Sequence, residues 1–187
     1  MIIASSSTLR AWYLWLLYGG LLTSVLGFMV RPSSDDMFSA VTLIYPGVGA
    51  LVAGHVCAGV LLYRCWRCVA VYTATFDSRR RPIDPAGAVV LTMTPLVNLV
   101  GMFFTLRPLP GELNWLAKAA DVEGRAPEDL GTGTAVVSLC ALIPVFGLIF
   151  GLVAGLVLLP YLLVSCSRVA DSIETRLSPS AKPAILL

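Results

Sequence analysis

The residue with the richest potential chemistry in this sequence is its only histidine, His55. It lies inside a run of 27 residues without charge, between Asp36 and Arg64. A neutral imidazole in such a run could ligate a haem or chlorophyll-type cofactor, or it could relay a proton. We favour a structural histidine that bonds Thr92 or a backbone carbonyl. We therefore expect no cofactor and keep haem or chlorophyll-type ligation by His55 as an alternative.

The cysteines could bind a metal or react with an oxidant, and the sequence has five of them. Cys57 lies about 200° around a helix from His55, so these two side chains cannot close one metal site. Cys65 and Cys68 form a C-x-x-C pair, and Cys166 should reach the same side of the membrane. There is no second C-x-x-C pair or nearby histidine to complete a tetrahedral site. We expect reduced thiols and no metal.

Three polar residues are expected inside the membrane: His55, Thr92 and Asn98. Asn98 follows Pro95 in another charge-free run. Its amide can hydrogen-bond a neighbouring helix or contribute to a small-solute site on a broken helix. The sequence has no Ser-His-Asp order, P-loop or intramembrane carboxylate. We therefore expect no catalytic residue and no enzyme activity, with a small-solute channel or carrier as an alternative.

The composition indicates which elements position these residues. Hydrophobic residues make up 57% of the chain and charged residues 13%, which argues against a soluble globular enzyme. Four charge-free runs are each long enough to cross a hydrocarbon core of about 30 Å as a helix. We predict an all-α polytopic membrane protein with one transmembrane domain, residues 1–177. Its four transmembrane helices should be residues 11–30, 38–63, 86–106 and 134–164.

The fourth predicted span is too long for a bilayer. Its apolar stretch, residues 135–164, would measure about 45 Å as a straight helix. Pro144 and Pro160 can each kink a helix, because proline lacks the N–H donor. We favour one long, bent helix over a hairpin of two shorter helices.

The distribution of basic residues predicts the side on which each loop lies. Nine of the 13 Lys and Arg residues lie at the termini and in the Arg64–Asp84 loop. This bias places those segments in the cytoplasm, and the loops around Asp35–Asp36 and Arg107–Asp129 outside. Five arginines should contact lipid headgroups on the cytoplasmic side: Arg64, Arg67, Arg79, Arg80 and Arg81.

Three segments outside the spans have their own patterns. Leu109, Leu113 and Leu116 recur at helical spacing beside Trp115, which predicts a short amphipathic helix in the outer interface. The second span has no helix breaker before Asp77, so its helix should continue into the cytoplasm. The tail, residues 178–187, has two prolines and no periodicity, so we expect it to be mobile.

Small residues at four-residue spacing indicate close helix packing, because they let another backbone approach. They form two stripes, one in the second span and one in the fourth. The stripes are Ala50, Gly54 and Ala58, and Gly147, Gly151 and Gly155.

The segment from Leu61 to Ala119 resembles a family of small four-span bacterial membrane proteins of unknown function. The similar residues are Leu62–Arg67, Asp84–Ala86, Thr94–Asn98, Arg107-Pro108 and Glu112–Trp115. The resemblance implies a multi-pass protein of the bacterial inner membrane and supplies no activity.

These patterns favour an accessory or scaffold subunit that acts by helix packing. Its partners would be the lipid bilayer and either a second copy or a larger membrane-protein complex, and we expect no nucleic acid.

Overall fold

The computed structural model describes residues 5–29, 37–94, 98–140 and 147–178, and every regular element in these ranges is a helix. The chain divides into two compact units between Val60 and Leu61, which we describe separately. Among the described residues, three helices are long and apolar enough to cross a membrane: Ser6–Met29, Val41–Phe76 and Ile149–Leu177. The all-helical class is confirmed, and the number of candidate spans is three rather than the predicted four.

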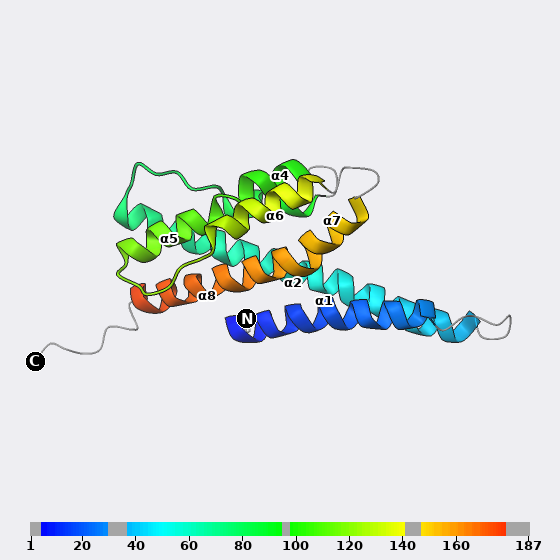
Figure 1. The fold of residues 1–187 in the computed structure, drawn as a ribbon. Coiled ribbons are helices and arrows are strands. Elements are labelled where there is room, and N and C mark those ends of the chain that lie inside the picture. The colour runs from blue at the N-terminus through cyan, green and yellow to red at the C-terminus, as the bar shows by residue number, and fades with distance from the viewer. Residues whose placement is uncertain (1–4, 30–36, 95–97, 141–146, 179–187) are drawn as a thin grey trace, which may run out of the picture. The chain divides into compact units, whose positions relative to one another are not determined.

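The first unit contains α1 (Ser6–Met29) and the N-terminal part of α2 (Met37–Phe76), which pack along small residues (Figure 1). Gly20, Ser24 and Gly27 are buried on one face of α1. A Cβ atom on Gly20 would lie 2.8 Å from the carbonyl oxygen of Gly47, so the two backbones come together only because both residues are glycine. The Ser24 hydroxyl donates to the Gly20 carbonyl at 2.8 Å, which satisfies this buried polar group within its own helix.

Both helices agree with the first two predicted spans, residues 11–30 and 38–63. α2 runs without a break to Phe76, so the predicted continuation of this helix is confirmed. Its 40 residues correspond to about 60 Å, twice the hydrocarbon thickness. The C-terminal part of α2 belongs to the second unit.

The third predicted span, residues 86–106, is wrong as a continuous helix. It consists of α3 (Pro85–Met93) and α4 (Asn98–Thr105), which pack against each other. The hydroxyl groups of Thr92 and Thr105 lie 2.7 Å apart, whereas thirteen residues of one straight helix would separate them by about 20 Å. The two helices therefore form a hairpin, and both of its ends lie on one side.

The break has a local cause. Residues that precede a proline avoid the helical region of the backbone, and Thr94, which precedes Pro95, has an extended ψ of 118°. At the other end of α3, the Asp84 carboxylate accepts a 2.7 Å hydrogen bond from the Gly87 N–H and Pro85 occupies the first turn. Both features favour a helix start at this position.

The fourth predicted span, residues 134–164, is also wrong as one helix. α6 (Glu128–Cys140) packs beside α7 (Gly147–Val153), the π-helical segment η1 (Ala154–Leu158) and α8 (Leu159–Leu177), as Figure 1 shows. The hairpin that we considered less favourable is therefore present. The π-helical segment ends two residues before Pro160, and π-helical turns and prolines are both recognised causes of irregularity inside a continuing helix. Pro144 lies outside the described residues.

The predicted amphipathic helix is confirmed as α5 (Leu109–Ala119), but it does not lie on the opposite side from Arg80. Leu109, Leu113 and Leu116 are fully buried, and α5 packs against α8. Arg80 Nη1 lies 3.0 Å from Glu112 Oε2 in α5. The loops Arg64–Asp84 and Arg107–Asp129 therefore share one side, which corrects their predicted separation. The loop at Asp35–Asp36 and residues 179–187 lie outside the described residues.

The shared side can be tested with an impermeant maleimide on Ser78→Cys and Glu123→Cys, both at exposed positions. We expect both variants to be labelled from the same side of sealed vesicles, with the wild-type chain as the blank for its native cysteines. Labelling of one variant from outside and of the other only after permeabilisation would contradict the hairpin of α3 and α4.

The hairpin itself depends on Gly101, because a Cβ atom there would collide with the backbone carbonyl of Leu91. We expect Gly101→Ala to lower the free energy of unfolding by about 1–3 kcal/mol, as overpacking does elsewhere. Thermal unfolding followed by circular dichroism in detergent measures this effect. The matched control is Gly133→Ala, where a Cβ atom meets nothing within 4 Å and Tm should be unchanged or higher. Equal effects of both substitutions would refute the close contact.

Candidate functional site

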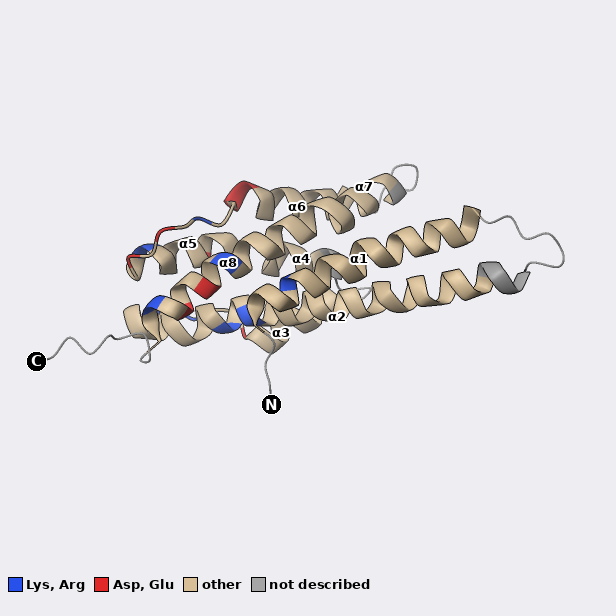
Figure 2. Cartoon of the chain, turned by 90° about the horizontal axis from the view of Figure 1, so that it is seen from below, with Lys and Arg blue, Asp and Glu red and all other residues tan. Residues whose placement is uncertain are grey.

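The charged side chains of the second unit gather at one end of its helices (Figure 2). This polar end is formed by the C-terminal ends of α2 and α8, by α5, and by the loop that leads into α6. The charges gather there because the two hairpins contain none. The chain has no charged residue between Asp84 and Arg107, or between Asp129 and Arg168. The candidate site of the protein is therefore this polar end, where charged groups border apolar helices.

Arg80 joins the segment after α2 to α5. Besides its ion pair with Glu112, its guanidinium carbon lies 4.2 Å from the centre of the Trp115 ring. A cation over an indole ring is attracted by the ring quadrupole. Trp115, which we predicted to border the apolar face of an interfacial helix, thus serves as a platform for Arg80.

Arg64 makes the second link, between α2 and α8. Its Nη2 atom lies 3.9 Å from Asp171 Oδ1 and 3.7 Å from Glu174 Oε2. Its Nη1 atom is buried and has no hydrogen-bond partner among the described residues. Two carboxylates of α8 thus face one guanidinium of α2.

Asn114 fastens the loop between α5 and α6. Its Nδ2 group donates to the Ala126 carbonyl at 2.9 Å and to Glu128 Oε1 at 2.8 Å, and its Oδ1 atom accepts from the Ala126 N–H at 2.7 Å. Asn114 was not predicted as a functional residue and lies in the Glu112–Trp115 segment of the resemblance. The one sequence signal for its contact with Ala126 and Glu128 was the position of its amide in the centre of the predicted amphipathic helix.

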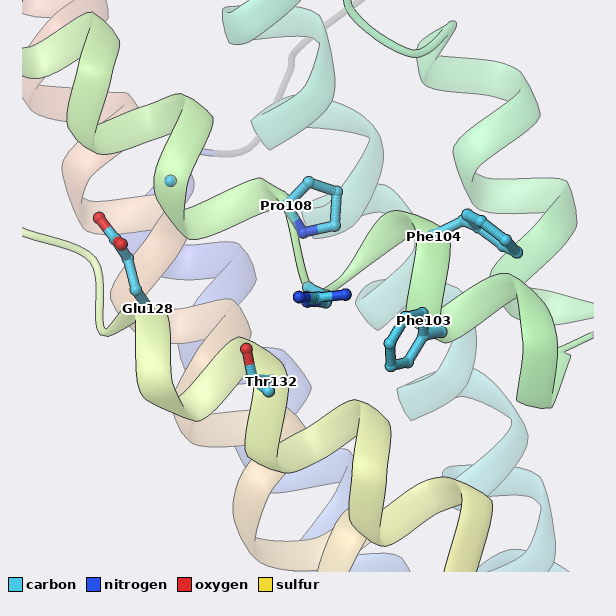
Figure 3. Close-up of a pocket in the computed structure, with 7 residues that line it drawn as sticks. Phe103, Phe104, Pro108, Glu128 and Thr132 are labelled. Atoms are coloured by element: carbon cyan, nitrogen blue, oxygen red, sulfur yellow. The ribbon is translucent and has the colours of Figure 1, made fainter.

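A pocket with a volume of about 410 Å³ opens beside Glu128, at the junction of α4, α5 and α6 (Figure 3). Arg107 places its guanidinium carbon 4.9 Å from the centre of the Phe103 ring. The pocket combines a cation, a carboxylate, a hydroxyl and two aromatic rings, which suits binding of a ligand with a polar and an apolar part. Its lining residues are Phe103, Phe104, Arg107, Pro108, Gly111, Glu128 and Thr132.

His55 lies in α2 within the first unit and is exposed. Its Nδ1 atom is 2.9 Å from the carbonyl oxygen of Leu51, one turn earlier. The backbone carbonyl that we expected as a partner is thus present. Thr92, the other expected partner, donates to the Ala88 carbonyl at 2.8 Å.

The other polar and sulfur-containing candidates lie inside helices. Cys65, Cys68 and Cys166 are buried, and Cys57 is half-buried. Among the described residues no three His, Cys, Asp or Glu side chains are grouped so that they could hold a metal ion. Asn98 begins α4, and its side chain lies outside the described residues.

The two stripes of small residues differ in their surroundings. Ala50 and Gly54 face α1: the Ala50 Cβ atom would lie 2.9 Å from a Cβ on Gly20, and a Cβ on Gly54 would lie 3.4 Å from the Leu17 nitrogen. Ala58 is buried in α2. In the other stripe, Gly147 begins α7, Gly151 is exposed and a Cβ on Gly155 would meet nothing within 4 Å.

Two of the five arginines expected at lipid headgroups, Arg64 and Arg80, are held in the ion pairs described above. Arg67, Arg79 and Arg81 are exposed, and their contact with lipid headgroups stays a prediction.

Comparisons with protein-family models, with curated proteins and with solved structures found no match to this chain. The resemblance of Leu61–Ala119 to a bacterial family stays a prediction.

The link between Arg80 and Glu112 can be measured by exchanging its charges. We expect Arg80→Glu and Glu112→Arg to lower the free energy of unfolding by about 1 kcal/mol each, since the pair is partly exposed. The double variant should recover most of the loss, and high salt should reduce all three effects. Thermal unfolding provides the measurement, with the exposed Arg81→Glu as control. Additive losses in the double variant would disprove the pairing.

Proposed function

We propose that this chain is an integral membrane scaffold or accessory subunit, which acts through its α1–α2 unit on a second copy or on a larger membrane complex. The observation that carries the proposal is the position of His55. Its imidazole is exposed on α2 between Val52 and Val56, which are 60% and 63% exposed. In lipid, a polar ring on an otherwise apolar face is unfavourable, whereas a partner helix can satisfy it.

The internal packing of α1 and α2 supports the same function. Gly20, Ser24 and Gly47 pack between the two helices, and His55 is exposed outside this contact. Large apolar side chains such as Trp15, which is 76% exposed, also lie on the outside of this unit. Helices in lipid associate through close packing and interhelical hydrogen bonds, and this unit offers both.

The interior offers little support for a channel or carrier. Three buried hydroxyl groups donate to backbone carbonyls of their own helices: Thr105 to Gly101, Thr134 to Leu130 and Ser138 to Thr134, each at 2.7 or 2.8 Å. Satisfied hydroxyl groups of this kind leave few free donors along a solute path.

Cofactor ligation by His55 is the second candidate function. If the imidazole donates its Nδ1 proton to the Leu51 carbonyl, then Nε2 is an outward-facing acceptor. Ligating histidines use such a backbone hydrogen bond to fix their tautomer and orientation. A haem or chlorophyll-type absorption band in native material, lost in His55→Leu, would favour this candidate over the scaffold.

The scaffold proposal predicts that His55→Leu weakens assembly. Counting photobleaching steps of labelled protein in liposomes should give more than one 19.9 kDa chain per complex for the wild type. We expect the variant to associate about fivefold more weakly, which corresponds to about 1 kcal/mol for one interhelical hydrogen bond.

Val56→Leu is the matched control, because it keeps an apolar side chain on the same face. A strictly monomeric wild type that also purifies from native membranes without a protein partner would refute the scaffold proposal.

A further inference from the structure

The pocket at the junction of α4, α5 and α6 lies at the boundary between the polar end and the apolar hairpins. Arg107 is the first charged residue after the charge-free α3–α4 hairpin, and Glu128 and Asp129 are the last before the charge-free α6–α7 hairpin. In a membrane protein such a boundary lies at the depth of the lipid headgroups.

The two charged groups of this pocket are available for a ligand. Arg107 forms no ion pair with a carboxylate among the described residues, and its guanidinium carbon lies over the Phe103 ring, 4.9 Å from the ring centre. Stacking on a ring leaves the N–H groups at the edge of the guanidinium plane free to donate. Glu128 uses Oε1 to accept from Asn114, and its carboxylate can accept further hydrogen bonds.

An apolar track leads away from the pocket on each of the two helices. On α4, Phe104 is 60% exposed and Val100, one turn away, is 57% exposed. On α6, Val136 follows Thr132 by one turn and is 46% exposed. Both tracks run from the pocket toward the charge-free parts of the hairpins, as an acyl chain would.

We propose that this pocket binds a phospholipid with a zwitterionic, primary-ammonium headgroup of the phosphatidylethanolamine class. Arg107 donates to the phosphate, because a guanidinium matches phosphate oxygens in a bidentate manner. Glu128 accepts hydrogen bonds from the ammonium group. An anionic headgroup without an ammonium would be repelled by Glu128 and the neighbouring Asp129, and a trimethylammonium group cannot donate a hydrogen bond to a carboxylate.

Gly111 provides the space on α5. A Cβ atom built there meets nothing within 4 Å, so a larger side chain at this position fills the pocket without displacing the protein. This permits a variant that blocks the ligand and retains the fold.

The test uses the full chain, reconstituted in vesicles with equal amounts of phosphatidylethanolamine, phosphatidylcholine and phosphatidylglycerol. After extraction into mild detergent, mass spectrometry measures which lipids remain bound. We expect phosphatidylethanolamine to be retained about tenfold over the other two lipids. Arg107→Gln should lower its retention about tenfold, since a charge-assisted hydrogen bond is lost, and Gly111→Met should abolish it.

Glu128→Gln keeps an oxygen that accepts from Asn114, and it should remove the preference for ethanolamine over choline. Arg168→Gln, at an exposed arginine of α8 outside the pocket, is the matched control and should leave retention unchanged. Circular dichroism verifies that each variant is folded.

Equal retention of the three lipids, preferred retention of phosphatidylglycerol, or no effect of Arg107→Gln would each overturn the proposal. Lipid binding rests on the proposed function in one respect: both need the chain to be embedded in a bilayer. Failure of that placement is distinguishable, because the chain would then not enter vesicles of any composition.

Discussion

The second unit depends on one backbone constraint, the extended conformation of Thr94 ahead of Pro95. Because α3 cannot continue past this point, α4 runs back beside it. Arg107, which follows α4, therefore lies at the same end of the hairpin as Asp84, which precedes α3. α5 then begins at that same end, and the ion pair of Arg80 with Glu112 becomes possible. The start of α6 follows from there, so all of the charged segments of this unit meet. A continuous third helix would have separated these charges by the thickness of the hydrocarbon core, about 30 Å.

The elements that the sequence predicted well are those whose signal is local. α1 and α2 follow from long runs without charge, and α5 follows from leucines at helical spacing. The α3–α4 hairpin was not predicted, and the hairpin of α6 with α7 was considered less favourable than one helix. The length of a charge-free run does not show whether the chain crosses the membrane or turns back, because both arrangements bury the same apolar residues. Pro144 and Pro160 were expected to kink a helix, and Pro95 to break one, but neither effect was taken as a reversal of the chain. The positive-inside count assumed that each charge-free run crosses the membrane once, so that the loops before and after it lie on opposite sides. The α3–α4 hairpin instead leaves both of its flanking loops on the same side.

The candidate site was less predictable, because its residues meet only after the chain has turned back. Arg107 and Glu128 come from different loops, and their shared pocket depends on the return of α6 beside α4. Gly131 was a partial sequence signal for the return of α6 beside α4. A Cβ atom on Gly131 would lie 2.8 Å from the carbonyl oxygen of Leu106, so this position accepts no side chain. In the first unit, Gly20 and Ser24 have the same four-residue spacing as Ala50 and Gly54, so this spacing could have indicated the buried face of α1.

The shortness of the α3–α4 hairpin has a mechanical consequence for a bilayer. Helices of 9 and 8 residues are about 13 and 12 Å long, which is less than half of a 30 Å hydrocarbon core. Inserted into a bilayer from one side, a hairpin of this length would reach through one leaflet only. It would add cross-sectional area to that leaflet alone, and a bilayer would relieve the mismatch by bending toward the opposite leaflet. Many copies gathered in one patch would impose a spontaneous curvature on the membrane that holds them.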